Sequence, residues 1–282
     1  MYRKLMFFVA ILALTTLACG FNVDLPQRVE PGPEVTETIA VPYPDEGETS
    51  LKLSFGAGEL DLAPGASGLV DGTVVYNYEQ FKPEIKTDGG DVHISMGDTR
   101  INFLPSGDDL KNEWDLKLGS QPMDLTIEAG AYQGEFEFGG LALTSLTVKD
   151  GAADVTLSFS QLNEANMSVF SYTTGASNVK MNGLANANFS LFDFSSGAGD
   201  YTLDFSGDLQ RDASVKIQTG LSNLIIIVPE GVNAVVTVEG GLSNVSAGSG
   251  WSQSGSVYKQ DGEGPTLTFV IEMGAGNLTL TR

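Results

Sequence analysis

The sequence MSVFSYTTGASN, from Met167 to Asn178, is followed 22 residues later by FSLFDFSSGAGD, from Phe189 to Asp200. In both stretches, apolar residues alternate with small polar ones, a glycine stands at the ninth position, and an Asn or Asp follows three places later. A unit repeated at nearly constant length is typical of folds in which each unit packs against its neighbours. These two stretches therefore predict a stack of similar β units.

The same pattern recurs around eight glycines. They are Gly56, Gly130, Gly151, Gly175, Gly197, Gly220, Gly241 and Gly274. From Gly130 to Gly241 the successive spacings are 21, 24, 22, 23 and 21 residues. Apolar residues stand five and three places before each glycine and, except after Gly130, four and six places after it, which is the period-two alternation of half-buried strands.

The phase of this alternation requires a corner in every unit. The apolar positions three before and four after the glycine are seven residues apart, so a straight strand would place them on opposite faces. We expect the glycine to turn the chain with a positive φ, and the Asn or Asp three places on to stabilise that turn through its side chain.

The pattern predicts an all-β fold. We expect a right-handed β-solenoid with rungs of about 22 residues over residues 130–282, and an N-terminal β module over residues 49–129 that caps its open end. An antiparallel β-meander or sandwich fits the same alternation and is the alternative. The segment Ser246–Pro265, rich in Gly and Ser, is expected to form a protruding loop.

Composition excludes several classes of function. The 282 residues carry a net charge of −21, and such an acidic surface repels the phosphates of nucleic acids. With one Cys and one His, a Cys/His metal site or a Cys–His nucleophile pair is excluded by counting. No cofactor and no metal ion are expected.

The first residues predict export. Met1–Ala18 reads as a signal peptide, with Arg3 and Lys4 before an apolar run that is too short to span a bilayer comfortably. Cys19 follows the stretch TLA and is similar to the lipidated cysteine of bacterial lipoproteins. The proline-rich residues 19–48 then predict a tether that holds the folded part away from the membrane.

The order of several motifs resembles the bacterial toast-rack lipoprotein family. The matching stretches are Leu51–Leu62 (LKLSFGAGELDL), Trp114–Ile127, Gly130–Leu141, Gly183–Phe189 (GLANANF) and Leu203–Gly207 (LDFSG). The resemblance implies kinship with the repeated-β domains of proposed adhesins and of cell-wall-stress response proteins. The family has no known catalytic residues, so none is carried over to this chain.

Three groups of polar residues are candidates for metal binding or catalysis. The Asn and Asp residues that follow the glycines could bind calcium, but their 22-residue period differs from the nine-residue period of calcium-binding β-rolls. Exposed carboxylates at Asp61, Glu135, Glu137 and Asp204 could form the acid–base pair of a glycosidase. His93 is expected at an ordinary exposed strand position. The favoured interpretation of the Asn and Asp residues after the glycines is turn formation, and that of the exposed carboxylates is a solvated surface.

A possible partner surface involves four apolar or aromatic residues. Ile225 and Ile227 break the alternation of their strand, and Trp251 and Tyr258 lie in the expected loop. The favoured function is a non-enzymatic, lipid-anchored extracytoplasmic scaffold that binds, adheres or senses at the cell envelope. Its expected partners are the membrane, through Cys19, and an envelope protein or polysaccharide. The alternatives are a carbohydrate-active enzyme on a solenoid face and a spacer without a ligand.

Overall fold

The computed structural model describes residues 27–45, 47–97, 103–105 and 110–282. These residues form an all-β fold, as the sequence predicts. The predicted signal peptide and Cys19 lie outside the described residues. In the described part of the chain, no helix is long and apolar enough to cross a membrane.

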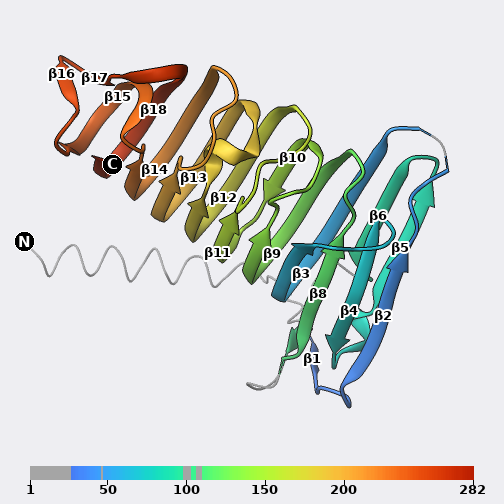
Figure 1. Ribbon diagram of the computed structural model, residues 1–282. Helices are drawn as coiled ribbons and strands as arrows, with labels where there is room; N and C mark the ends of the chain where they lie inside the picture. Colours follow the sequence, from blue (N-terminus) through green and yellow to red (C-terminus); the bar gives the residue numbers. More distant parts are fainter. Residues whose placement is uncertain (1–26, 46, 98–102, 106–109) are drawn as a thin grey trace, which may run out of the picture.

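Long strands that bend in the middle make up most of the molecule (Figure 1). They are β3 (Thr49–Pro64), β9 (Met123–Glu137), β12 (Met167–Asn182), β13 (Phe189–Asp204), β14 (Ala213–Ile227), β15 (Gly231–Ala247) and β18 (Gly262–Thr281). We call the part before the bend the first arm, the part after it the second arm, and the two arms together a rung. First arms stack on first arms and second arms on second arms, so one continuous sheet folds into two layers.

Two further rungs are each built from two separate strands. One consists of β6 (Asp91–Met96) and β8 (Asn112–Leu118), which pair with the first and second arms of β3. The other consists of β10 (Leu143–Lys149) and β11 (Ala152–Ser158), which lie between β9 and β12. Stacking between rungs is parallel throughout.

The middle rungs follow one another in chain order. Leu125, Leu146, Phe170, Phe192 and Val215 occupy one register position in β9, β10, β12, β13 and β14. Successive residues in this row are offset by 21, 24, 22 and 23 positions. Although these lengths differ slightly, the register keeps apolar residues above apolar residues, and all five side chains are buried.

Chain order is broken at both ends of the stack, which differs from the sequential winding predicted by the glycine spacings. β18 lies between β14 and β15, although β15 precedes it in the chain. At the other end, β3 lies between β9 and the later rung β6/β8. Parallel pairing depends on matching side-chain pattern, so a rung can enter the stack out of sequence wherever its loop is long enough.

Antiparallel strands close the N-terminal end. β5 (Pro83–Asp88) pairs with β6, while β4 (Val70–Tyr76) pairs with β8 and is followed by β2 (Val35–Val41). β2 lies within the residues expected to form the tether, so this part of the segment belongs to the sheet. The expected boundary between residues 129 and 130 falls inside β9, so the parallel stack runs through it without a break.

The remaining short elements lie outside the rungs. They are β1 (Gln27–Val29), β7 (Phe103–Pro105), the antiparallel hairpin of β16 (Ser252–Ser254) and β17 (Val257–Gln260), and the 3-10 helices η1 (Glu79–Phe81) and η2 (Leu184–Ala187). The hairpin, together with the end of β15 and the start of β18, occupies the segment that was expected to be a protruding loop.

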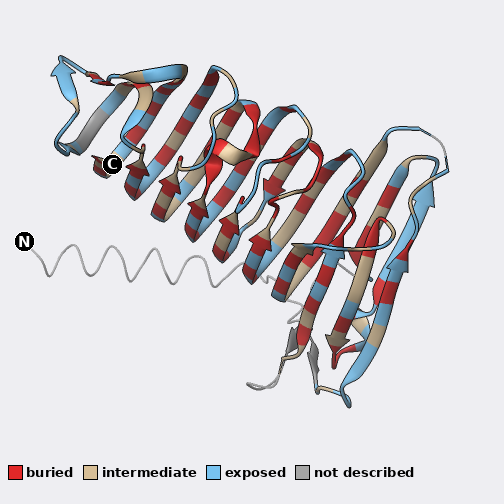
Figure 2. Ribbon diagram, in the orientation of Figure 1, coloured by how far each residue is buried: buried red, intermediate tan, exposed pale blue. Residues whose placement is uncertain are grey.

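The core lies between the two layers. Side chains of each arm alternate between the core and the solvent, which produces the bands of buried and exposed residues in Figure 2. Aromatic rings follow one another along the core: Phe170 and Phe192 have centroids 4.7 Å apart, and Tyr172 and Phe194 are stacked at 5.7 Å. These contacts between rungs supply the packing that holds the stack together.

The corner glycines are required by a close approach between rungs. Seven of them form one column along the bends, and none of these seven has the positive φ that the sequence predicts. A Cβ on Gly175 would lie 2.4 Å from the carbonyl oxygen of Gly151, and a Cβ on Gly197 would lie 2.6 Å from that of Gly175. In this column Gly274 stacks on Gly220. The expectation of a left-handed corner is therefore wrong, because space rather than φ selects glycine.

The Asn and Asp residues beyond the corners connect rungs rather than close turns. Asp200, Asn223 and Asn277 share one register position in β13, β14 and β18. Asn223 donates its side-chain amide to Asp200 over 2.7 Å, and Asn277 donates to Asn223 over 2.8 Å. This exposed ladder replaces the turn-stabilising bonds predicted from the sequence, because parallel stacking places like residues side by side.

Candidate functional site

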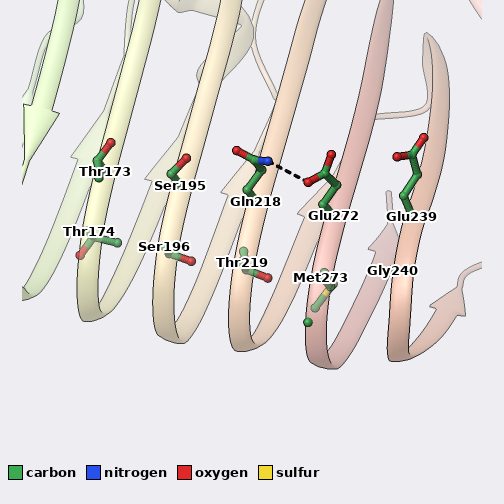
Figure 3. Close-up of a pocket in the computed structure, with 11 residues that line it drawn as sticks. Thr173, Thr174, Ser195, Ser196, Gln218, Thr219, Glu239, Gly240, Glu272 and Met273 are labelled. Atoms are coloured by element: carbon green, nitrogen blue, oxygen red, sulfur yellow. Dashed lines mark hydrogen bonds between the residues drawn. The ribbon is translucent and has the colours of Figure 1, made fainter.

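An open groove crosses the outer face of the first arms just before the bend. It has a volume of about 690 Å³ and extends over β12, β13, β14, β18 and β15. Figure 3 shows two rows of side chains along it, which run perpendicular to the strands. The outer row consists of Thr173, Ser195, Gln218, Glu272 and Glu239, and the row nearer the bend of Thr174, Ser196, Thr219, Met273 and Gly240.

Register explains why these residues meet although they come from distant parts of the chain. Thr173 pairs with Ser195, Ser195 with Gln218, Gln218 with Glu272 and Glu272 with Glu239. Gln218 donates its Nε2 hydrogen to Oε2 of Glu272 over 2.7 Å (Figure 3). The groove therefore presents hydroxyl groups at one end and carboxylates at the other, spaced by the distance between strands of about 4.8 Å.

The groove lining offers many groups that can form hydrogen bonds. Hydroxyl, amide and carboxylate groups exchange hydrogen bonds with a polar ligand that lies across several strands. Among the described residues, those that line the groove include no His, Lys, Arg or Cys. Sequence reasoning did not identify this groove, because its rows form only after β18 enters the stack beside β14.

A second polar region lies on the outer face of the second arms. Asp61 is in register with Asp115 on one side and Glu135 on the other. Partial burial raises the pKa of Asp61, a backbone hydrogen bond at Glu135 opposes this shift, and the charges of Asp115 and Glu113 add to it. Two shallow hollows of about 300 and 350 Å³ border these carboxylates.

The four carboxylates considered for glycosidase chemistry are not all brought together. Asp61, Glu135 and Glu137 line one of these hollows, whereas Asp204 lies on β13, three rungs beyond β9, and accepts a hydrogen bond from the backbone of Ser206. Among the described residues, no group of three or more His, Cys, Asp or Glu side chains is arranged to hold a metal ion.

His93 is paired with a serine, a contact that the sequence did not predict. Its Nε2 atom lies 2.8 Å from Oγ of Ser54 on the neighbouring rung. Burial, followed by the charges of Lys52 and Lys86, lowers the pKa of His93, so the ring is neutral at pH 7. In the described part of the chain, no carboxylate is bonded to the other ring nitrogen, so the pair lacks the third member of a catalytic triad.

The residues predicted as a partner surface differ in their exposure. Ile225 is 38% exposed on the second arm of β14, between Thr202 and Thr279, and Ile227 is half-buried. Trp251 packs partly against the core. Tyr258, on β17, is only 6% exposed. Ile225 is thus the most accessible of the four, while Tyr258 belongs to the core.

Comparison with known proteins agrees with this architecture. The sequence matches the N-terminal domain of toast_rack, DUF2154, over residues 30–171, which is half of the chain. No curated protein matches the sequence. A solved structure of a proposed cell adhesion protein from Clostridium sporogenes aligns with 88% of this chain and 99% of its own, at 20% identity and a TM-score of 0.50. At this identity, the likeness shows a shared fold.

Two other solved structures align at lower scores. One is a proposed adhesin from Bacteroides fragilis, with 10% identity over 89% of this chain and 99% of its own and a TM-score of 0.36. The other is a proposed lipid binding protein from Parabacteroides distasonis, with 10% identity, the same coverage and a TM-score of 0.39. The family match over residues 30–171 bears out the resemblance seen in the sequence: the chain belongs to the toast-rack family.

Proposed function

We propose that this chain is a non-enzymatic lipoprotein, anchored outside the cytoplasm through Cys19, that acts as an adhesion or binding scaffold at the cell envelope. The anchor rests on the signal-like residues 1–18 and the cysteine that follows them. The scaffold is a right-handed solenoid with rungs of about 22 residues in its middle part. The residues between Cys19 and β2 form a tether that holds this solenoid away from the bilayer, since β2 itself is paired with β4.

The groove on the first arms carries the binding assignment. It is open, crosses five neighbouring strands and offers a row of hydroxyl, amide and carboxylate groups. A polymer rich in hydroxyl groups, such as an envelope polysaccharide, can exchange hydrogen bonds with several of these strands at once. Many weak contacts along a rigid face give useful affinity without an enclosed pocket. The fold shared with the proposed adhesion protein from Clostridium sporogenes supports the same class of function.

Binding can be tested with immobilised envelope polysaccharides. The full chain is expected to be retained, and the double variant Gln218→Ala/Glu272→Ala is expected to lose about tenfold in affinity, because two groove side chains are removed. The matched control is Lys180→Ala/Thr202→Ala, which alters the opposite face of the same region and leaves retention unchanged. Equal retention of all three proteins would exclude the groove as the binding surface. Release of shortened glycan would show instead a carbohydrate-active enzyme.

The anchor has a separate test. Mass spectrometry of the protein produced in its own membrane is expected to find acyl chains on Cys19 as the first residue. Cys19→Ala is expected to leave the signal peptide uncleaved and the protein unacylated. Detection of an unmodified Cys19 in the mature protein would contradict lipid anchoring and would leave the binding assignment of the groove untouched.

A further inference from the structure

The two layers of the stack have four ends, and three of them are closed by antiparallel strands. β5 covers β6, β4 and β2 cover β8, and β17 followed by β16 covers the first arm of β15 (Figure 1). The fourth end is the second arm of β15, residues 242–247, which pairs with β18 on one side. Among the described residues, no strand pairs with its other side. Its outer backbone groups form an open edge.

The core is also incompletely covered at this edge. Val245 occupies the same register position as Leu278 of the neighbouring rung. Leu278 is fully buried, whereas Val245 is only half-buried. One more strand on the second arm would complete the burial of Val245 and satisfy the backbone groups of the arm.

Charge indicates which partner fits. Residues 240–258 contain no Asp, Glu, Lys or Arg, although the whole chain carries a net charge of −21. The strands at the opposite end are charged: β5 carries Glu84, Lys86 and Asp88, and β2 carries Glu37. Charged edge strands resist pairing with other chains, and an uncharged edge does not. Two copies of so acidic a protein repel each other least where both surfaces are neutral.

We propose that the second arm of β15 is a self-association edge. Two copies place these arms side by side in antiparallel orientation, related by a two-fold axis, and each arm becomes the closing strand of the other. This arrangement gives the fourth end the same kind of antiparallel partner that the other three have within one chain. It is isologous and closed, so it yields dimers and not filaments. It does not depend on the ligand of the groove.

Sedimentation of the full chain in nonionic detergent tests this arrangement. We expect a concentration-dependent dimer whose dissociation constant rises about tenfold or more in Ser246→Lys, because this exposed position lies on the edge and the variant brings a lysine from each copy into the interface. The control Thr38→Lys places the same charge on the exposed edge strand β2 and is expected to leave the dimer intact. Raising NaCl from about 0.05 M to about 0.5 M should strengthen the dimer, since it screens the repulsion between acidic bodies.

Amide hydrogen exchange provides a second readout that needs no variant. The amides of residues 244–247 are expected to exchange more slowly as protein concentration rises, while those of β2 do not change. A monomer at every concentration would overturn the proposal. So would dimers insensitive to Ser246→Lys, as expected if the N-terminal apolar segment drives association. Larger oligomers that disappear in Thr38→Lys would also contradict the proposal. They would show that the β15 end of one copy stacks head to tail on the β2 end of the next.

Discussion

The middle of the stack and its ends share one sequence pattern but differ in how the chain connects them. From β9 to β14, each rung is followed in space by the next rung in the chain. At the ends, β3 and β18 each lie between two rungs that directly follow one another in the chain. The repeat therefore determines the shape of a single rung. The lengths of the loops and the strands available for pairing determine where that rung lies in the stack.

The largest expected difference between middle and end concerns the corner. Gly175→Ala would put a Cβ 2.4 Å from a backbone oxygen of the neighbouring rung, so we expect a loss of about 3 kcal/mol or more in the free energy of unfolding. At Gly248, just beyond β15, a Cβ would lie 3.4 Å from its nearest neighbour, and Gly248→Ala is expected to change stability by less than about 0.5 kcal/mol. Denaturant unfolding measures both. Similar values at the two sites would show that close rung contact does not select glycine.

Core packing should show the next largest difference. Phe192 in β13 is fully buried among aromatic rings, so Phe192→Ala is expected to cost about 3–5 kcal/mol. Val245 in β15 is half-buried, and Val245→Ala is expected to cost about 1 kcal/mol or less in the monomer. Chemical denaturation at low protein concentration compares the two. A cost at Val245 that grows with protein concentration would be further support for pairing at this edge.

The exposed ladder of side-chain amides gives a smaller effect. Asn223 bonds both Asp200 and Asn277, so Asn223→Ala is expected to reduce the free energy of unfolding by about 1 kcal/mol. Asn244, at the same register position in β15, makes no side-chain hydrogen bond within the described residues, and Asn244→Ala is expected to be nearly neutral. Equal effects on the thermal midpoint would mean that the ladder contributes nothing.

The smallest expected changes in stability come from charged side chains near the N-terminal end of the stack. A hydrogen bond from Lys52 lowers the pKa of Glu128 below 4.5, so its ion pair stabilises the fold above that pH, and the stability is lost as the pH falls through the lowered pKa. Glu128→Gln is expected to cost about 0.5 kcal/mol at pH 7 and nothing near pH 3, since the pair is partly exposed.

Asp61 on the other outer face should behave in the opposite way. Its pKa is raised above 3.8, so its contribution is fully present below that pH and is lost as the pH rises through the raised pKa. Asp61→Asn is therefore expected to increase stability at pH 7 by a few tenths of a kcal/mol, about the size of a surface charge effect, and to have no effect near pH 3. Unfolding curves of the Glu128→Gln and Asp61→Asn variants at both pH values test these two predictions. The same sign for the two variants would contradict the assigned causes.

Some features were predictable from single units and others were not. The alternation around Phe192 and Phe194 predicted which side chains are buried, because period two is a local property of a strand. The reason for the corner glycines was missed, because the carbonyl that excludes a side chain belongs to another rung. The contact between Ser54 and His93 was missed for the same reason, since His93 belongs to another rung, on β6, which pairs with β3.

The candidate groove illustrates the same limit. Thr173 and Ser195 could be aligned from the 22-residue repeat, and their shared face follows from the period of two. Glu272 and Glu239 could not be placed, because their position depends on β18 entering the stack between β14 and β15. The hydroxyl end of the groove was thus within reach of sequence analysis, whereas its acidic end was not.

The sequence alone determined that the chain is all-β, which residues enter the core, and where each rung bends, because these properties depend on residues close together in the chain. The order of the rungs, the close contact that selects the corner glycines, the groove and the open edge of β15 were decided only by tertiary structure. Parallel rungs with similar patterns can pair in more than one order. Loop length and the covering of every edge then select among these orders, and both are properties of the whole molecule.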